Sequence, residues 1–202
     1  DTTTGLVRDA EKLGQLSDRF LGEEDGWFDD VLTISIHQEK NYPLDTGDVA
    51  DRGRGAGEGY NGNVPLPPGA GHVAYLEVMD RIVLPALDRF RPDVIVVACG
   101  FDAGIYDPIA QMLCTGETFG AMTERVKAAA ERLCGGRLVM VHEGGYSEVY
   151  VPFCGHATIA TLAGSTIEAP DPLKPNFTAR QPSARTEAFQ LELIADMAQE
   201  LL

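Results

Sequence analysis

The chain has 202 residues and a mass of 21.8 kDa, which is a typical length for one domain. Its residues are 44% hydrophobic and 23% charged, a composition that allows a packed core and excludes collagen-like, coiled-coil and wholly disordered proteins. The 31 acidic residues outnumber the 16 basic ones, and the formal net charge is −15. Because nucleic-acid affinity comes largely from Lys and Arg, we expect no nucleic-acid partner.

The cysteines and the apolar runs indicate the compartment. Four cysteines occur singly, without a C-x-x-C pair, so we expect reduced thiols in the core: Cys99, Cys114, Cys134 and Cys154. No apolar run reaches the length of a bilayer span, and the first residues lack the features of a signal peptide. We therefore expect a cytoplasmic location and no membrane association.

Apolar spacing predicts an alternation of strands and helices along the chain. Helical spacing occurs at residues 6–21, 75–86, 119–133 and 151–162, and β-branched or continuous apolar runs occur at residues 31–36, 93–98 and 138–141. We expect the last two runs to be strands buried on both faces. The polar stretch 38–71 reads as a long functional or disordered loop. This order predicts an α/β domain with a mainly parallel sheet and right-handed crossovers.

A change of composition near residue 165 divides the chain. Residues 165–183 hold four prolines and few apolar residues, so we expect an extended linker there. An apolar stripe from Phe189 to Leu201 then predicts a helix that packs on the body, on a neighbour or on a partner chain. We therefore expect a domain over residues 1–164, followed by a Pro-rich segment and C-terminal helix over 165–202.

Polar and glycine-containing segments follow three of the predicted strands. They are Ser35–His37, Gly100–Asp102 and Glu143–Tyr146. Because ligands of open α/β sheets bind beyond the carboxyl ends of the strands, these segments are the candidate site. Asp102 suits a metal ligand or an acid–base group, and equally a turn or helix cap. Tyr146 suits a donor to a developing oxyanion, and equally a core tyrosine beside a tight turn.

Two other sequence patterns give weaker evidence for a functional site. The run Gly57–Gly62 satisfies G-x-G-x-x-G, but no strand directly precedes it and the proline-rich sequence after it does not open a helix. We therefore do not expect a dinucleotide site there. The four histidines lie too far apart in sequence for a helical metal motif, and we interpret each as structural: His37, His72, His142 and His156.

Taken together, four segments resemble the histone deacetylase family, in order and in spacing. They are Val31–Gln38, Arg54–Gly69, Cys99–Ala103 with Asp107-Pro108, and Glu143–Tyr146. The resemblance is strongest to the class II type, which includes bacterial deacetylase-like amidohydrolases and acetylpolyamine amidohydrolases, and it covers about residues 28–164. It implies a three-layer α-β-α fold of the arginase/deacetylase kind.

The resemblance also implies a chemistry, the zinc-dependent hydrolysis of N-acetyl or other acyl amides of lysine-like amines. Asp102 matches one zinc ligand of the family, and Tyr146 matches the tyrosine that polarises the amide carbonyl. A structural monovalent cation, normally K⁺, would bind Ser35 and the carbonyl of Ile36. A second cation site would involve Val31 and Tyr60.

Substrate-channel residues follow from the same resemblance, and the expected substrate is a small-molecule or peptide acyl-amine. The matching positions are Tyr42, Phe101, Ile109, Gly144 and Gly145. Polyamine-specific relatives place an acidic residue where this chain has Ile109, so we expect acyl-lysine to be preferred over acetylpolyamines. A homo-oligomer is left open.

One departure from the family leaves two hypotheses. The family carries an Asp-x-Asp-x-His-His motif and an upstream His-His pair, which supply the other zinc ligands and the general base, whereas residues 1–30 here contain no histidine. In the first hypothesis the chain belongs to an active zinc hydrolase whose other half is not in these residues. In the second it is a catalytically inactive deacetylase-like fragment or interaction module.

Overall fold

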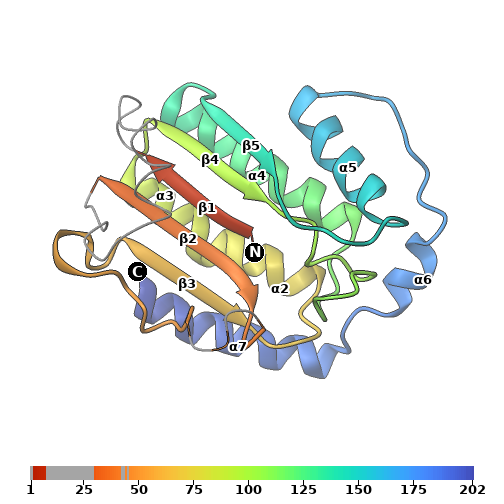
Figure 1. Cartoon of the computed structure of the whole chain (residues 1–202), viewed down its shortest axis with the longest axis horizontal. Helices are drawn as coiled ribbons and strands as arrows, with labels where there is room; N and C mark the ends of the chain where they lie inside the picture. The colour runs from red at the N-terminus through yellow and green to blue at the C-terminus, as the bar shows by residue number, and fades with distance from the viewer. Residues whose placement is uncertain (1, 8–29, 42–43, 45) are drawn as a thin grey trace.

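The computed structural model describes residues 2–7, 30–41, 44 and 46–202. A five-stranded sheet runs through their centre in the order β3-β2-β1-β4-β5 (Figure 1). The strands are β1 (Thr2–Val7), β2 (Val31–Gln38), β3 (Asn61–Leu66), β4 (Val94–Cys99) and β5 (Leu138–His142). Figure 1 shows α2, α3 and α4 behind this sheet, so they provide a helical layer against it. The α/β class predicted from the sequence is confirmed.

The direction of β1 differs from the expected pattern. The pair β4–β5 is parallel, as predicted, and β2–β3 is also parallel, whereas β1 runs antiparallel to both neighbours, with Thr4 opposite Ile34 and Val97. The helix predicted for residues 6–21 is wrong at Leu6 and Val7, which lie in β1. Its remaining residues, 8–21, lie outside the described ones. Threonine favours a pleated strand, and the run Thr2–Thr4 was the signal that the helical spacing overrode.

The polar stretch 38–71 also contains regular structure that its composition concealed. A 3₁₀ turn forms at Gly55–Gly57, and Asn61–Leu66 forms β3 despite Gly62 and Pro65. Proline has no N–H to donate, so it is unfavourable in a strand that pairs on both sides. Pro65 is tolerated because β3 is an edge strand of the described sheet. The expectation of one long loop is therefore wrong for this part.

The helix predicted for residues 75–86 is longer and is interrupted. It consists of α2 (His72–Val78), a π-helical turn at Met79–Val83 and α3 (Leu84–Phe90). Pro85 lacks an N–H for the carbonyl one turn earlier, and the π-helical turn just before it absorbs this mismatch. The chain then continues to Phe90, so Pro85 distorts the helix without closing it.

The next two helices begin and end where the sequence places them. In α4 (Gly116–Cys134), Thr115 and Thr118 form a reciprocal capping box at the first turn, and Gly135 ends the helix with a left-handed φ of 61°. Helix α5 (Val151–Ala163) ends before Gly164, which has a φ of 62°. These two helices pack against each other.

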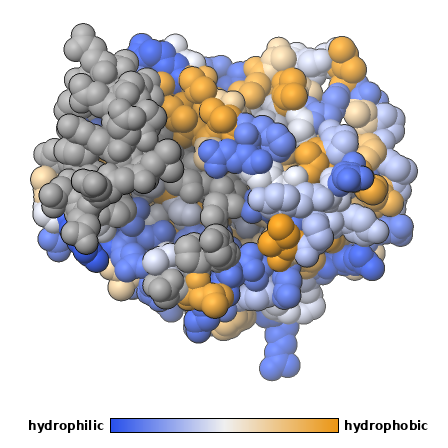
Figure 2. Space-filling model, in the orientation of Figure 1, coloured by the Kyte–Doolittle hydropathy of each residue, from blue (hydrophilic) through white to orange (hydrophobic). Residues whose placement is uncertain are grey.

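Strand β5 is more exposed than predicted. Val139 and Val141 are 49% and 46% exposed; alternate residues of a strand share one face, so the described residues leave this face of β5 largely uncovered. Helix α5 is also rich in apolar residues, but only Cys154 and Thr158 of this helix are buried in the described structure. Apolar side chains accordingly reach the surface, as Figure 2 shows in orange. The prediction that β5 is buried on both faces is wrong for the described structure.

The C-terminal segment packs on the body, which was one of the three expected possibilities. Residues 165–183 are not wholly extended, because α6 (Lys174–Ala179) forms within them. Helix α7 (Ala184–Leu201) contacts α2 and β3 and buries Ile194 and Met197. The guanidinium of Arg52 donates hydrogen bonds to the carbonyls of Glu200 and Leu201, which satisfies the last turn of α7.

The core forms between the sheet and its helices. It contains Ile34, Leu66 and Ile95 from three strands and Leu87 from α3. All four cysteines are free and buried, as predicted. Burial raises the pKa of the Cys99 thiol to about 11 and that of Cys154 to about 12, so both remain protonated at neutral pH.

The difference in side-chain burial between β4 and β5 gives a prediction about stability. Ile95→Ala empties a fully buried site and should lower the free energy of unfolding by about 2–5 kcal/mol. Val139→Ala, at an exposed position of β5, should cost about 1 kcal/mol or less. Urea unfolding of both variants measures this. Equal losses would mean that β5 is covered in solution.

Candidate active site

The loops that follow β4 and β5 lie against each other. The Phe101 N–H donates a hydrogen bond to the Gly144 carbonyl at 2.8 Å, and the same carbonyl accepts from His142 Nε2 at 3.0 Å. Gly100 sits so close that a methyl group there would lie 3.3 Å from the Gly144 nitrogen. Parallel pairing of β4 with β5 therefore brings two of the three predicted segments together.

Asp102 lies half-buried at this junction. A methyl group at Gly100 or Gly144 would come within 2.6 or 3.0 Å of Asp102 Oδ1, so a side chain at either position would press on the carboxylate. The carboxylate also lines an open pocket of about 310 Å³. The other residues around that pocket are Ile36, His37, Gln38, Asn41, Tyr75, Ala103, Ala110 and Met112.

Tyr146 projects from the loop after β5. Its side chain is 56% exposed, and its backbone N–H donates to Asp107 Oδ2 at 2.8 Å. Gly145 has a φ of 119°, and a methyl group there would lie 2.9 Å from Phe101 Cβ and 3.0 Å from Val151 Cγ2. Gly145 is thus required by its backbone conformation and by close packing. This is the exposed tyrosine that the sequence pointed to, and it is not a core residue.

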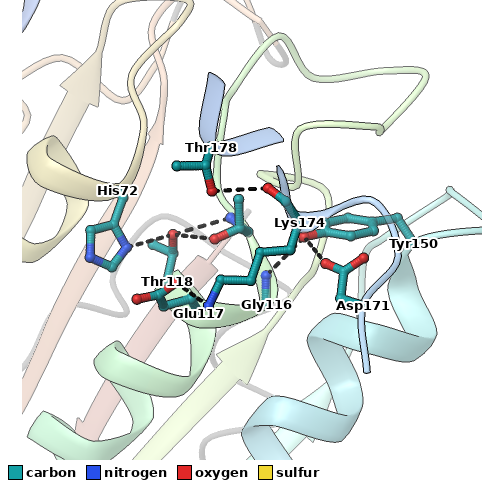
Figure 3. A network of polar contacts seen from close by, with 9 residues as sticks. His72, Gly116, Glu117, Thr118, Tyr150, Asp171, Lys174 and Thr178 are labelled. Atoms are coloured by element: carbon teal, nitrogen blue, oxygen red, sulfur yellow. Dashed lines mark hydrogen bonds and ion pairs between the residues drawn. The ribbon is translucent and has the colours of Figure 1, made fainter. Parts of the chain in front are cut away.

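The other end of the Tyr146 loop is anchored by Tyr150, which directly precedes α5. Its hydroxyl accepts a hydrogen bond from the Gly116 N–H at 3.2 Å and donates to Asp171 Oδ2 at 3.0 Å (Figure 3). Burial raises the pKa of this phenol, so it stays protonated as a donor. The same network includes the ion pair of Lys174 with Glu117 at 3.0 Å, which ties α6 to α4.

The segment Ser35–His37 reaches the same pocket from β2. The Ser35 hydroxyl is 2.9 Å from His37 Nδ1, and His37 Nε2 is 2.9 Å from the Gly47 carbonyl. Burial lowers the pKa of His37, which favours the neutral ring. Ile36 lines the pocket with Asp102. All three predicted strand-end segments therefore meet at one edge of the sheet.

The residues of the two expected cation sites lie apart. Ser35 and Ile36 are near the end of β2 beside the Asp102 pocket, whereas Val31 begins β2. Tyr60 directly precedes β3; its carbonyl accepts from the Thr33 N–H at 2.9 Å, and its ring packs on Phe90. The two pairs are thus at opposite ends of one strand, as two separate sites require, and their cation roles stay predictions.

The expected channel residues have mixed placements. Tyr42 lies outside the described residues. Phe101 is 7% exposed and packs edge-on against Phe119 with ring centroids 5.1 Å apart, so its ring belongs to the core and we assign it no substrate contact. Ile109 is 54% exposed in the loop after Asp102. Gly144 and Gly145 act through the backbone contacts described above.

Sequence reasoning did not assign three residues that the structure places at this site. Asp107 was noted only as part of a motif, although it bonds the Tyr146 amide. His37 was interpreted as a structural histidine, and Tyr75 as part of a helix face, yet both line the Asp102 pocket. The one available signal was Asp107-Pro108, because an Asp before proline commonly begins a turn.

The described residues do not assemble a complete metal centre. Within residues 2–7, 30–41, 44 and 46–202, no three His, Cys, Asp or Glu side chains gather closely enough to hold an ion. Both nitrogens of the nearby His37 ring already face Ser35 and Gly47. The described residues therefore offer one carboxylate that lines a pocket and one exposed phenol on the neighbouring loop.

Comparison with known proteins decides the family. A profile of the histone deacetylase domain matches residues 23–162. The chain belongs to the histone deacetylase family. It is 52% identical over 170 residues to a histone deacetylase-like amidohydrolase of Pseudomonas aeruginosa, a match that covers 84% of this chain and 45% of the relative. It is 41% identical over 157 residues to a probable deacetylase of Archaeoglobus fulgidus, covering 76% of this chain and 44% of that protein.

Solved structures agree on the fold. The histone deacetylase Clr3 superposes with a TM-score of 0.67 at 24% identity, over 84% of this chain and 27% of that one. The HDA15 HD domain superposes with a TM-score of 0.61 at 29% identity, over 83% of this chain and 45% of that one. This confirms the arginase/deacetylase-like fold. The chain spans less than half the length of these relatives, and none of its described helices has the length and apolar character to cross a bilayer.

Proposed function

We propose that this chain supplies the tyrosine-bearing part of an amide-hydrolysing site, in a deacetylase that acts on N-acyl amides of lysine-like amines. The observation that carries the proposal is the junction of the two loops, which sets the Asp102 carboxylate against Gly144 and leaves Tyr146 exposed beside it. The family to which the chain belongs supports hydrolysis of an acyl amide.

Zinc is the cofactor that the resemblance implies, and the described residues do not fit it alone. A catalytic zinc needs about three protein ligands and an open position. Here Asp102 is the one matched ligand, and no group of three candidates forms within the part of the chain that the structure describes. We therefore derive no step through zinc, and we propose that ligands outside the described residues complete the site. A bound K⁺ near Ser35 and Ile36 remains part of this proposal.

Tyr146 carries the chemistry that this chain contributes. Its exposed phenol is suited to donate a hydrogen bond to the oxygen of the acyl amide as negative charge develops there. Its backbone N–H is bound by Asp107, which helps to fix the loop that carries the donor. Such a donor stabilises the transition state more than the bound substrate.

The alternative is a catalytically inactive deacetylase-like module, and the incomplete ligand set is the observation that favours it. The reading frame upstream of Asp1 separates the two functions. An Asp-x-Asp-x-His-His run encoded there would support the hydrolase. Its absence from that frame would support the inactive module.

The first prediction concerns zinc and activity. The 202-residue chain alone should retain no stoichiometric zinc after dialysis and should not turn over an acetyl-lysine peptide. A form that includes upstream ligands should hold one zinc, which Asp102→Ala removes, while Asp48→Ala, at an exposed turn, retains it. Elemental analysis measures both. Turnover by the 202-residue chain that a chelator blocks would contradict this account of its ligands.

A second prediction concerns the tyrosine. In an active form, Tyr146→Phe should lower kcat by about 10²- to 10³-fold, with a smaller effect on KM, because the hydroxyl acts mainly in the transition state. Steady-state kinetics on an acetyl-lysine peptide measure this. A variant within a few-fold of the parent would remove Tyr146 from the chemistry.

The substrate class is proposed from Ile109. This side chain is 54% exposed in the loop after Asp102, where the resemblance places the residue that separates polyamine from lysine substrates. An apolar side chain does not compensate for desolvating a secondary ammonium. We therefore propose an acyl-lysine or similar neutral-tailed amide as the substrate. The net charge of −15 raises encounter rates with cations more than it discriminates among them.

This gives a third prediction for the active form. The ratio of kcat/KM for an acetyl-lysine peptide over acetylspermidine should exceed one, and Ile109→Glu should lower that ratio. Ile167→Glu is the matched control, because it adds the same charge at an exposed isoleucine outside this loop. A preference of the parent for acetylspermidine that persists at high salt would overturn the assignment.

A further inference from the structure

Two Asp-Pro turns of the same construction bracket the Tyr146–Tyr150 segment. One is Asp107-Pro108-Ile109, in the loop after Asp102, and the other is Asp171-Pro172-Leu173, in the C-terminal segment. In each, the Oδ1 atom of the aspartate accepts the N–H two residues later at 2.8 Å. In each, the Oδ2 atom remains available to a group elsewhere in the chain.

The two Oδ2 atoms bind opposite ends of the same five residues. Asp107 Oδ2 accepts the Tyr146 N–H at 2.8 Å. Asp171 Oδ2 accepts the Tyr150 hydroxyl at 3.0 Å, and that hydroxyl in turn accepts the Gly116 N–H (Figure 3). Tyr150 is 1% exposed, whereas Tyr146 is 56% exposed.

We propose that Asp107 and Asp171 are positioning residues that clamp the Tyr146–Tyr150 segment at both ends and so aim the Tyr146 hydroxyl. The proposal rests on the function proposed above. In the described part of the chain no hydrogen bond holds the Tyr146 hydroxyl, so the contacts that position this residue are those of its backbone. Because the hydroxyl is at the far end of a long side chain, a small backbone rotation displaces it enough to weaken a catalytic hydrogen bond.

Aspartate suits both positions for a chemical reason. A carboxylate offers two accepting oxygens, one for the turn and one for the clamp, whereas an asparagine amide offers one oxygen and one donating nitrogen. The proline that follows lacks an N–H, and it restricts the aspartate backbone to extended conformations. The conformation of the turn is thereby restricted, while Oδ2 points away from the turn toward its partner.

Asp171 gives the C-terminal segment a role at the site. The deacetylase profile matches residues 23–162, so this half of the clamp lies beyond the matched domain. The segment is joined to the body independently, through Gln181, whose side chain accepts from the His72 N–H at 2.9 Å and donates to the Leu113 carbonyl at 2.8 Å. Its attachment does not depend on Asp171 alone.

The test uses the 202-residue chain and measures the backbone dynamics of Tyr146 by NMR. Asp107→Asn keeps one accepting oxygen for the turn, but its amide NH₂ group then faces the Tyr146 N–H and does not accept a hydrogen bond from it. The Tyr146 amide should exchange with solvent about tenfold faster or more, and its order parameter should fall from about 0.85 to below about 0.6. Asp171→Asn and Tyr150→Phe should each lower the Tyr146 order parameter and speed exchange of the Gly116 amide.

Asp48→Asn is the matched control, because Asp48 also accepts the N–H two residues later but makes no clamp bond to the site. It should leave Tyr146 unchanged, and core amides such as that of Val97 should be unchanged in every variant. In addition, the unaltered chain should show a scalar coupling between the Tyr146 amide nitrogen and the Asp107 carboxyl carbon. That measurement needs no variant, so it decides the case even where one fails to fold.

Three results would overturn the clamp. They are absence of the coupling, a Tyr146 amide whose exchange stays within twofold of the parent in Asp107→Asn, and a Tyr146 order parameter that Asp171→Asn leaves unchanged. These readouts need no zinc, substrate or turnover, so they are independent of the proposed function. In an active form, the clamp variants should lower kcat with little change in KM. If Tyr146→Phe kept full activity, the function would fail while the clamp could still stand.

Discussion

The hydrogen bond from the Phe101 N–H to the Gly144 carbonyl is the contact on which the rest of the site depends. It joins the loop after β4 to the loop after β5. Because these strands are parallel, both loops lie at the carboxyl ends of the strands. Gly100 and Gly144 then leave space for the Asp102 carboxylate in its present position. One loop thus carries the carboxylate and the turn at Asp107, and the other carries Tyr146.

The described structure leaves apolar surface exposed and provides only part of a site. Strand β5 ends the described sheet, with Val139 and Val141 half exposed, and the apolar helix α5 is only partly covered. Asp102 and Tyr146 reach the site from the loops after β4 and β5, and His37 reaches the Asp102 pocket from β2. Family membership supports the proposed hydrolysis, whereas the proposed zinc site would need ligands beyond the described residues.

Much of the fold was predictable because hydrophobic spacing and helix caps are local. Helix α4 was found from its apolar stripe and its terminal glycines, and β4 from its continuous apolar run. Strand β1 was missed because its place between β2 and β4 depends on partners distant in sequence, and β3 because Pro65 and Gly62 are tolerated only at an edge. The exposure of β5 depends on what lies beside it, which no local pattern specifies.

The same contrast between local patterns and contacts distant in sequence applies to the site. Asp102 and Tyr146 were predicted because their segments resemble a family, while the packing of the Phe101 ring on Phe119 depends on a partner that its own segment does not specify. Asp107 and Asp171 were not assigned, because their partners Tyr146 and Tyr150 are distant in sequence and the turn motif does not name them. The two Asp-Pro pairs are visible in the sequence, and only the fold shows which groups their carboxylates bind.

The most direct test of the central claim is a crystal structure of an active form with an acetyl-lysine hydroxamate bound. The account predicts that the Tyr146 hydroxyl lies within hydrogen-bond distance of the ligand carbonyl, that Asp102 ligates the metal, and that the Phe101–Gly144 hydrogen bond is retained. A ligand bound elsewhere, or a Tyr146 hydroxyl directed away from the carbonyl with Asp102 off the metal, would contradict it.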